Sequence, residues 1–413
     1  MLRAESSPVL RAQDLDWNLV NPAFQRDPYQ HYRWERDHGA VHVLSAGDHT
    51  YYRIIGYDEI VTVLTDTQTF SSRTTNELGW LVFRDPPEHD KLRQAIAKAF
   101  TPRAIAVLDA PVAEIVTDLW NHVLADHGGD LHEFCNLLPV SVISLILGIP
   151  VSRRQDMSRW SLQSLEVLGS MFGFPVSSEA KQGSAELVDY LKGLLDSYRH
   201  RPADNIGAHL VTLSMQGEIS EKDLLAFAQF LFVAGHETTM HSLLGGFGIL
   251  AQDQALFSRI KEQPELIKVF VEEVLRYRTT IQAIARISTR DTEIGGVKIP
   301  KGAVVIPVLA NGNLDSKKFE GPETFVLGRP NANQHLTFGK GIHTCIGAPL
   351  ARREMQLTFE HAIKTIKSIT LDPLRPPIPH IGGSTNEYGF DSLSVKIEPM
   401  PTLDLSSPAL HSL

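Results

Sequence analysis

The chain has 413 residues, of which 43% are hydrophobic and 21% charged, as is ordinary for a globular protein of one large domain or two to three smaller ones. Its formal net charge of −9 argues against general nucleic-acid binding, which usually needs a basic surface. The two cysteines, Cys135 and Cys345, do not suggest a disulfide framework, so we expect a reducing cytoplasm.

Nothing in the sequence predicts a membrane segment. The first twenty residues mix charged with apolar side chains and lack the hydrophobic core of a signal peptide or anchor. The most apolar stretch, residues 137–151, is interrupted by two prolines and is too short to span a bilayer. We expect residues 1–26 to form an extension, residues 27–400 a single domain and residues 401–413 a tail.

The first predicted elements lie between residues 27 and 66. Asp27 and Pro28 suit the start of a helix that runs to His38 and ends at Gly39. Alternating apolar and polar residues at 41–44 and 51–55, around a Gly-Asp turn, predict a β-hairpin. A helix is expected to follow over residues 57–66.

An irregular segment, residues 74–83, ends in four apolar residues that would anchor a loop in the core. Residues 85–100 then predict a helix that starts with two prolines and carries His89 and Arg93 on one face. By itself such a pair is typical of a solvated helix face. Residues 104–200 have the pattern of further helices, with a break at about residues 165–178.

A long helix is predicted from Ser220, which with Asp223 forms a capping box, to about Leu250. Its length would be roughly 45 Å, and it is apolar nearly all round, which indicates a buried helix. The polar residues 236–239 (His-Glu-Thr-Thr) at its middle exclude a membrane span. Buried polar side chains need partners, so this group calls for a specific role.

Later in the chain, Glu273 and Arg276 lie three apart on a predicted helix, a common and weak pattern. Residues 293–310 predict a Gly-Gly hairpin followed by a strand. Residues 384–397 suggest another hairpin, with residues 386–390 at its tip.

The most specific pattern is Phe338–Gly347, with the sequence FGKGIHTCIG, in which glycines surround Cys345. A helix is expected directly after it, from Ala348 to about Lys364, and its N-terminus would favour the thiolate form of the cysteine. A lone cysteine in a turn is usually structural. The loop, however, fixes six residue types in the pattern F-G-x-G-x-H-x-C-x-G. Such a pattern is expected by chance in a chain of this length with a probability on the order of one in a million.

This loop resembles the cysteine-ligand loop of the haem-thiolate monooxygenases, the cytochromes P-450. The resemblance, which runs from about Asp27 to about Ile397, implies a mainly α fold with small β-sheets (α+β), a triangular prism of helices around a buried haem b. Cys345 would be the axial ligand of the iron, and a thiolate ligand favours O–O cleavage. The implied haem-binding residues are His89, Arg93, Ala234, Gly235, Arg286, Phe338, Gly339, His343, Cys345 and Gly347.

The polar group of the long helix, within the segment AGHETT, resembles the oxygen-activating motif of the same family. Glu237 would relay protons from solvent, Thr238 would act beside the oxygen, and Gly235 would let the backbone open near the iron. Glu273, Arg276 and Arg329 match a structural triad. Thr280 stands where the family usually has a proline.

The resemblance also implies an apolar substrate pocket and places the break at residues 165–178 in a mobile lid, although an ordinary helical hairpin fits the sequence equally well. The implied pocket residues are Trp80, Phe83, Phe227, Leu231, Ile281, Ile284, Tyr388 and Phe390.

The expected activity is insertion of one atom of O2 into an apolar organic substrate by a cytoplasmic monomer that binds neither nucleic acid nor membrane. Electrons would come from NAD(P)H through a reductase and a ferredoxin or flavodoxin. Such an acidic donor would need a basic patch, for which the candidates are Lys91, Lys98, Lys340, Arg352 and Arg353.

Two other functions remain open from the sequence. A peroxygenase of the same fold would turn over with hydrogen peroxide alone, and those relatives typically lack the acid–threonine pair present here as Glu237 and Thr238. A haem sensor or carrier would form no product when electrons and oxygen are supplied.

Overall fold

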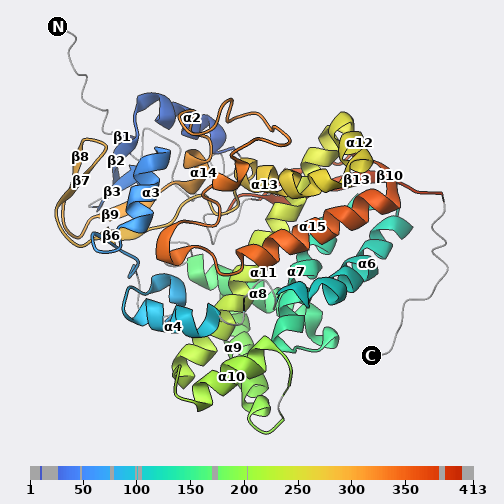
Figure 1. Ribbon diagram of the computed structural model, residues 1–413, viewed down its shortest axis with the longest axis horizontal. Helices are drawn as coiled ribbons and strands as arrows, with labels where there is room; N and C mark the ends of the chain where they lie inside the picture. The colour runs from blue at the N-terminus through green and yellow to red at the C-terminus, as the bar shows by residue number, and fades with distance from the viewer. Residues whose placement is uncertain are drawn as a thin grey trace.

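Helices are the main elements of the molecule; the six-stranded sheet lies at one side, and strands β10 (Ile366–Leu371) and β13 (Ser394–Pro399) of a second sheet lie at the other, beside α12 (Gln254–Glu262) and α15 (Ala348–Thr365) (Figure 1). This computed structural model describes residues 10–11, 27–46, 49–74, 79–97, 100, 105–169, 175–201, 203–380 and 387–401. No helix among these residues has both the length and the apolar character needed to cross a membrane. The expectation of a mainly α fold with small sheets is confirmed.

The named helices follow the chain from the strand-rich side into the helical part. They are α2 (Tyr29–His38), α3 (Tyr57–Thr65), α4 (Glu88–Ala97), α6 (Asp109–Ala125), α7 (His132–Leu147), α8 (Arg154–Gly169), α9 (Ser178–Tyr198), α10 (Ile206–Met215), α11 (Glu221–Gln252), α12 (Gln254–Glu262), α13 (Ile267–Tyr277), α14 (Leu309–Gly312) and α15 (Ala348–Thr365).

The strands form one six-stranded sheet in the order β1-β2-β3-β9-β6-β4, one three-stranded sheet in the order β10-β13-β5, and the pairs β7-β8 and β11-β12. Their bounds are β1 (Leu10–Arg11), β2 (Val41–Ala46), β3 (His49–Ile54), β4 (Phe70–Ser71), β5 (Gly128–Asp130), β6 (Arg286–Ser288), β7 (Thr292–Ile294), β8 (Val297–Ile299), β9 (Val304–Pro307), β10 (Ile366–Leu371), β11 (Ile378–Pro379), β12 (Phe390–Ser392) and β13 (Ser394–Pro399).

Helix α11 organises the core. Its first turn is capped as predicted, because Ser220 Oγ accepts a hydrogen bond from the backbone N–H of Asp223. It packs against α7, α8, α9, α10, α12, α13 and α15, and its side chains are buried over most of its length. A Cβ at Gly246 would come within 2.4 Å of Phe359 on α15, so only glycine permits this close helix contact.

Most of the predicted elements are confirmed, with shifts at their ends. Helix α4 begins at Glu88 rather than with the prolines, and α2 begins at Tyr29, whose N–H donates to Asp27. The helices on either side of the predicted break are present as α8 and α9, but residues 170–174 lie outside the described residues.

The C-terminal hairpin differs from the prediction. Strand β12 pairs antiparallel with β11, which precedes it by ten residues, whereas β13 joins β10 and β5 in the three-stranded sheet. The pairing depends on partners distant in sequence, which local alternation cannot identify. Of the expected tip, residue 386 lies outside the described residues, and Glu387 bridges to Ile281.

Candidate functional site

The cysteine loop lies between the six-stranded sheet and the start of α15. The backbone N–H of Cys345 donates to the carbonyl of Phe338 (2.8 Å), which closes the loop. Gly339 and Gly341 have φ of 69° and 72°, a region that favours glycine. A Cβ at Gly341 would also lie 2.7 Å from the carbonyl oxygen of Leu64 at the end of α3. The glycines therefore let the loop turn sharply against a neighbouring helix.

The sulfur of Cys345 faces the interior of the protein. Its side chain has accessible surface, yet burial raises the pKa of the thiol. A cysteine can have accessible surface and still be desolvated when its sulfur borders an enclosed space rather than bulk solvent. The backbone N–H groups of Gly347 and Ala348 and the charges of Arg93 and Arg352 lower the pKa, but by less than burial raises it. The expected preference for thiolate thus requires a bound cation such as a metal ion, which deprotonates a coordinating thiol.

Two arginines and two histidines gather beside the cysteine. Arg93 Nη2 donates to the carbonyl of Thr344 (2.6 Å), and the rings of His89 and His343 lie 4.3 Å apart. Burial lowers the pKa of His343 to about 3, and the charges of Arg286, His89 and Arg93 lower it further. Burial also lowers the pKa of the Arg286 guanidinium, to about 10. The four residues, His89, Arg93, Arg286 and His343, are called the cationic group below.

The two arginines of the cationic group have no matching anion. Among the described residues, neither Arg93 nor Arg286 forms an ion pair with a carboxylate within 4.0 Å, whereas His89 Nδ1 lies 2.9 Å from the carboxylate of Asp90. The buried Nε2 of His89 has no hydrogen-bond partner among these residues, and His343 Nε2 lies 2.9 Å from the hydroxyl of Ser72. Buried charges are normally paired. A ligand with carboxylate groups that sits over the sulfur of Cys345 would supply this pairing, as the propionates of haem do.

The middle of α11 carries the polar residues in a continuous helix. Thr238 Oγ1 donates to the carbonyl of Ala234 (2.9 Å), and helical spacing puts Phe227, Leu231 and Ala234 on the same face as Thr238. His236 points to another neighbour, because its Nε2 lies 2.7 Å from Asn136 on α7.

The backbone of α11 does not open at Gly235 in this structure, and a role of Gly235 beside the iron stays a prediction. The helix is regular through this position, and a Cβ at Gly235 would come within 2.8 Å of Ile143 Cδ1 on α7. Gly235 therefore allows α7 and α11 to pack closely. The motif alone could not show this, because it does not say which side of the helix faces α7.

Glu237 is buried and lies beside two histidines that the sequence analysis did not single out. His241 Nε2 and His380 Nε2 are 3.5 Å and 3.8 Å from Glu237 Oε1. Burial raises the pKa of Glu237, but its hydrogen bond with His241 and the nearby histidine charges lower it more, to about 2. The sequence held no signal for His380, because it is more than 140 residues from Glu237.

The three residues Glu273, Arg276 and Arg329 form one buried ion-pair group, called the buried triad below. Arg276 donates twice to the Glu273 carboxylate, at 2.8 Å each, and Arg329 Nε donates at 3.0 Å. The remaining guanidinium hydrogens reach backbone carbonyls, including those of Asn313 and Thr324. Each charge therefore has partners.

Thr280 replaces the expected proline within a hydrogen-bonded junction. Its hydroxyl lies 3.2 Å from Ser242 Oγ on α11, and its carbonyl accepts from the N–H of Tyr388 (2.8 Å). Thr280 thus links α11 to the C-terminal segment; a proline would keep the carbonyl contact with Tyr388 but lose the hydroxyl contact with Ser242.

The expected pocket residues fall into three groups. Trp80 and Phe83 stack with centroids 6.3 Å apart, and Phe230, which the sequence analysis missed, lies 5.2 Å from Trp80 and 6.4 Å from Phe227. Leu231 lies one turn after Phe227 on α11.

Ile281 and Ile284 pack against the core of the six-stranded sheet. Tyr388 and Phe390 form the third group, on the C-terminal segment whose Glu387 bridges to Ile281. The Tyr388 ring contacts Tyr29 on α2, with its hydroxyl 3.4 Å from Arg278, and Phe390 packs near Gly248, roughly 15 Å beyond Thr238 along α11.

The mainly helical fold has three features of the haem-thiolate proteins. A cysteine lies in a glycine-rich loop, a helix starts directly after it, and Arg93 and Arg286 beside it have no carboxylate partner among the described residues. The cytochrome P450 family profile matches residues 15–380 of the chain. The chain belongs to the cytochrome P450 family and is a cytochrome P450 monooxygenase.

Individual relatives agree with this assignment. The chain is 34% identical to cytochrome P450 109 of Bacillus spizizenii over 317 residues, which cover 74% of this chain and 76% of the relative. It is 32% identical to the cytochrome P450 monooxygenase PikC of Streptomyces venezuelae over 392 residues, which cover 90% and 92% of the two chains. The crystal structure of CYP109E1 from Bacillus megaterium, in complex with testosterone, superposes with a TM-score of 0.82 at 30% identity and covers 91% of this chain and 99% of that one.

Proposed function

We propose that this chain binds haem b through the sulfur of Cys345 and oxidises a small apolar organic molecule with O2. The single observation that carries the proposal is that Arg93 and Arg286, beside that sulfur, have no carboxylate partner among the described residues. Arg93, Arg286, His89 and His343 would hold the two propionates, since a guanidinium suits a carboxylate particularly well. Bound haem supplies the activation of dioxygen, helped by electron donation from the thiolate.

The side chains of α11 would manage protons in this reaction. Thr238 would place its hydroxyl at the oxygen, and Glu237 would pass protons to that point from the solvent side. The low pKa of Glu237 keeps it ionised and ready to accept a proton from a neighbour at neutral pH. Thr238→Ala should release hydrogen peroxide in place of product, whereas substrate affinity stays nearly unchanged.

The substrate pocket would be lined by Trp80, Phe83, Phe227 and Phe230, with Leu231 between this aromatic cluster and Thr238. Their surface is apolar and partly aromatic, which favours a largely hydrocarbon substrate. A spectral titration of the ferric enzyme with a panel of terpenoids, steroids, fatty acids and macrolides would identify the class, because a fitting compound displaces the water on iron.

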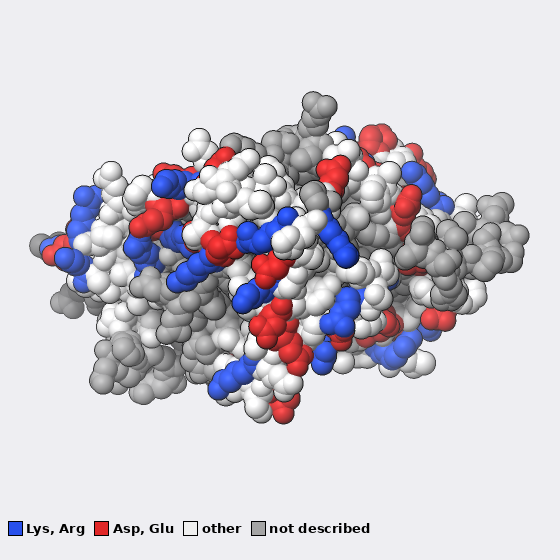
Figure 2. Space-filling model, turned by 90° about the horizontal axis from the view of Figure 1, so that it is seen from below, with Lys and Arg blue, Asp and Glu red and all other residues white. Residues whose placement is uncertain are grey.

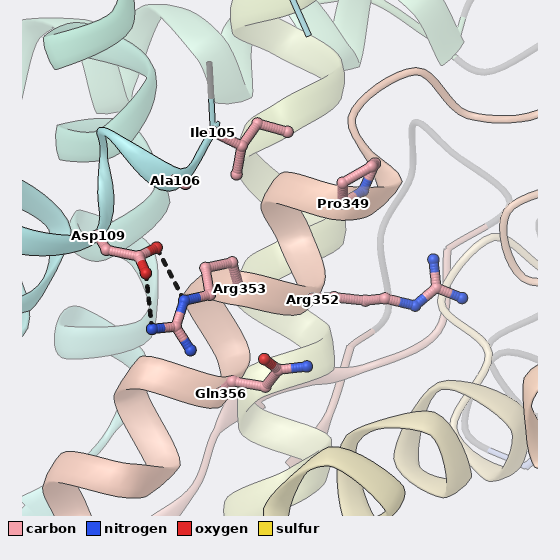
Figure 3. Close-up of a pocket in the computed structure, with 7 residues that line it drawn as sticks. All are labelled: Ile105, Ala106, Asp109, Pro349, Arg352, Arg353 and Gln356. Carbon is pink, nitrogen blue, oxygen red and sulfur yellow. Dashed lines mark hydrogen bonds and ion pairs between the residues drawn. The ribbon is translucent and has the colours of Figure 1, made fainter. Parts of the chain in front are cut away.

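The electron donor would dock where α15 begins, close to Cys345. A surface depression there is bordered by Ile105, Pro349 and Arg353, and Figure 3 shows Arg353 turned toward Asp109 while Arg352 extends to the other side. Arg353 and Arg352 are both held in bidentate ion pairs, with Asp109 and Glu272.

The basic patch proposed for the donor is therefore smaller than expected. Lys98 lies outside the described residues, and Lys91 is exposed. Burial lowers the pKa of Lys340, and the charges of Lys318 and Arg352 lower it further, so these three cations lie near one another. On the face drawn in Figure 2, acidic and basic side chains are interspersed over the described residues. A ferredoxin or flavodoxin would thus bind to a small area around Lys318 and Lys340. The location of the protein in the cytoplasm stays a prediction.

The experiment that tests the proposal is reduction of the purified holoprotein under carbon monoxide. The long-wavelength Soret band of a thiolate-bound haem is expected for the wild type and absent for Cys345→Ala. A wild-type spectrum without this band, or a Cys345→Ala variant that still forms product, would contradict it.

A further inference from the structure

A polar cluster connects the middle of α11 to the last hairpin and to the surface. Glu237 and His241 lie one turn apart on α11, His380 follows β11, and Asp391 lies in β12. The rings of His241 and His380 are 4.7 Å apart, and both face the Glu237 carboxylate. The exposed fraction of the side chains rises along the series, from 0% for His241 and 6% for Glu237 to 13% for His380 and 46% for Asp391. Titratable groups therefore lead from solvent to Glu237.

The hydrogen bonds define the protonation of each ring. His380 Nδ1 lies 2.6 Å from Asp391 Oδ1, so this nitrogen carries a proton. Its Nε2 faces Glu237, and a ring with a carboxylate at each nitrogen is most stable as the imidazolium. In His241, Nδ1 accepts from the backbone N–H of Phe390 (3.3 Å). His241 is therefore neutral, with its proton on Nε2.

The charges of all neighbouring groups agree with this assignment. Burial lowers the pKa of His380, but the hydrogen bond to Asp391 and the charges of Glu237 and Asp391 raise it overall. Burial lowers the pKa of His241 overall. The carboxyl of Glu387 also hydrogen-bonds to Glu237 and helps to keep it ionised. The positive charge of the cluster thus lies on His380, and the negative charges that flank it lie on Glu237 and Asp391.

A metal ion is the other occupant that such a cluster could hold. One ligand atom from each of Glu237, His241 and His380 lies within 4.8 Å of the others. His380 would suit a metal, because its second nitrogen bonds to a carboxylate, as metal-binding histidines usually do. His241 would not, because its Nδ1 accepts a hydrogen bond, so its Nε2 carries hydrogen and offers no lone pair. The geometry favours a proton over a metal ion.

We propose that His380, held as an imidazolium by Asp391, supplies the protons that Glu237 passes on during turnover. The proposal rests on the proposed role of Glu237 and Thr238. In each step one proton leaves Nε2 of His380 and reaches a carboxylate oxygen of Glu237 through one bridging water, since the two atoms are 3.8 Å apart. The imidazolium thereby becomes a neutral ring that keeps its hydrogen on Nδ1, hydrogen-bonded to Asp391, and it then regains one proton at Nε2 from bulk water. No electron is transferred within the cluster.

The charge on His380 can be measured without turnover. Holoenzyme with ¹³C-labelled histidine, in the diamagnetic ferrous carbon monoxide form, is titrated by NMR, and His380→Gln identifies the signal. We expect His380 to titrate above the ordinary 6.5. Asp391→Asn should lower this midpoint by about one unit or more, because it removes one of the two flanking charges. A wild-type midpoint at or below 6.5, or one that Asp391→Asn leaves unchanged, would overturn the proposal.

The role in turnover is tested with His380→Gln, whose amide keeps a polar group beside Glu237 but cannot be protonated. We expect kcat to fall about tenfold with KM unchanged, hydrogen peroxide release to rise, and the solvent isotope effect to grow. The difference from wild type should be largest below the NMR midpoint of His380 and vanish above it, since only the protonated ring can supply the proton. His361→Gln, at the far end of α15, is the matched control and should behave as wild type.

The outcomes separate this proposal from the proposed function. If the thiolate-type Soret band is absent, both are wrong. If the band is present and Thr238→Ala releases peroxide, but His380→Gln keeps the wild-type rate and pH profile, only the role of His380 is wrong.

Discussion

Two buried groups of charges lie in the same protein with opposite degrees of compensation. In the buried triad, Glu273 receives hydrogen bonds from Arg276 and Arg329, and backbone carbonyls take the remaining guanidinium hydrogens. In the cationic group, Arg93 and Arg286 donate to backbone carbonyls at 2.6 Å and 2.8 Å but have no carboxylate partner among the described residues. In the triad, every charge has its partner within the chain. In the cationic group, a bound anion would supply the partner that Arg93 and Arg286 lack among the described residues.

The largest expected effect comes from breaking the triad. Glu273→Ala leaves two buried guanidinium groups without their carboxylate, which typically costs about 3–5 kcal/mol. We expect the free energy of unfolding of the holoprotein, measured with urea, to fall by this amount. Arg33→Ala removes an exposed partner of Glu323 and serves as a control, with little change expected. A small effect of Glu273→Ala would show that the triad is not structural.

Removing a charge from the cationic group should weaken haem binding without lowering the stability of the apoprotein. Arg286→Leu takes away a cation that has no ion-pair partner among the described residues, so the apoprotein should unfold at the same or a slightly higher urea concentration. Loss of a charge-assisted hydrogen bond of about 1.5–3 kcal/mol should weaken haem retention about tenfold to hundredfold. The rate of haem transfer to an acceptor protein measures this, with the exposed Arg290→Leu as control. Unchanged retention would contradict the role of Arg286.

A smaller effect is expected where α7 crosses α11. Gly235→Ala forces a methyl group against Ile143 Cδ1 and should lower the free energy of unfolding by about 1–2 kcal/mol. The double variant Gly235→Ala/Ile143→Val removes that δ-carbon and should recover most of the loss. If Gly235 instead made room beside the iron, the second substitution would not help and the haem spectrum would change.

The smallest effect is expected at the junction of α11 with the C-terminal segment. Thr280→Val keeps the shape but removes the hydroxyl that contacts Ser242, and Ser242 still donates to the carbonyl of Thr238 (2.8 Å). We expect a loss of at most about 1 kcal/mol in thermal unfolding experiments. A larger loss, or a change in peroxide release, would show that this hydroxyl supports Thr238 itself.

The sequence by itself determined the elements whose signals are local. The cap at Ser220, the apolar pattern of α11 and the glycines around Cys345 act through neighbouring backbone atoms, so these elements and the cysteine loop could be predicted within a few residues. His89 and Arg93 were placed on one helix face for the same reason.

Only the tertiary structure decided how distant segments meet. It brings His380 and Asp391 to Glu237, Ser72 to His343 and Phe230 to Trp80, and it places the ring of Tyr388 against Tyr29 on α2. It also shows that Ile143 on α7 packs against Gly235, in the space that a side chain at this position would occupy. Such contacts depend on which faces of separate elements pack together, and side-chain periodicity within one element does not specify its neighbour.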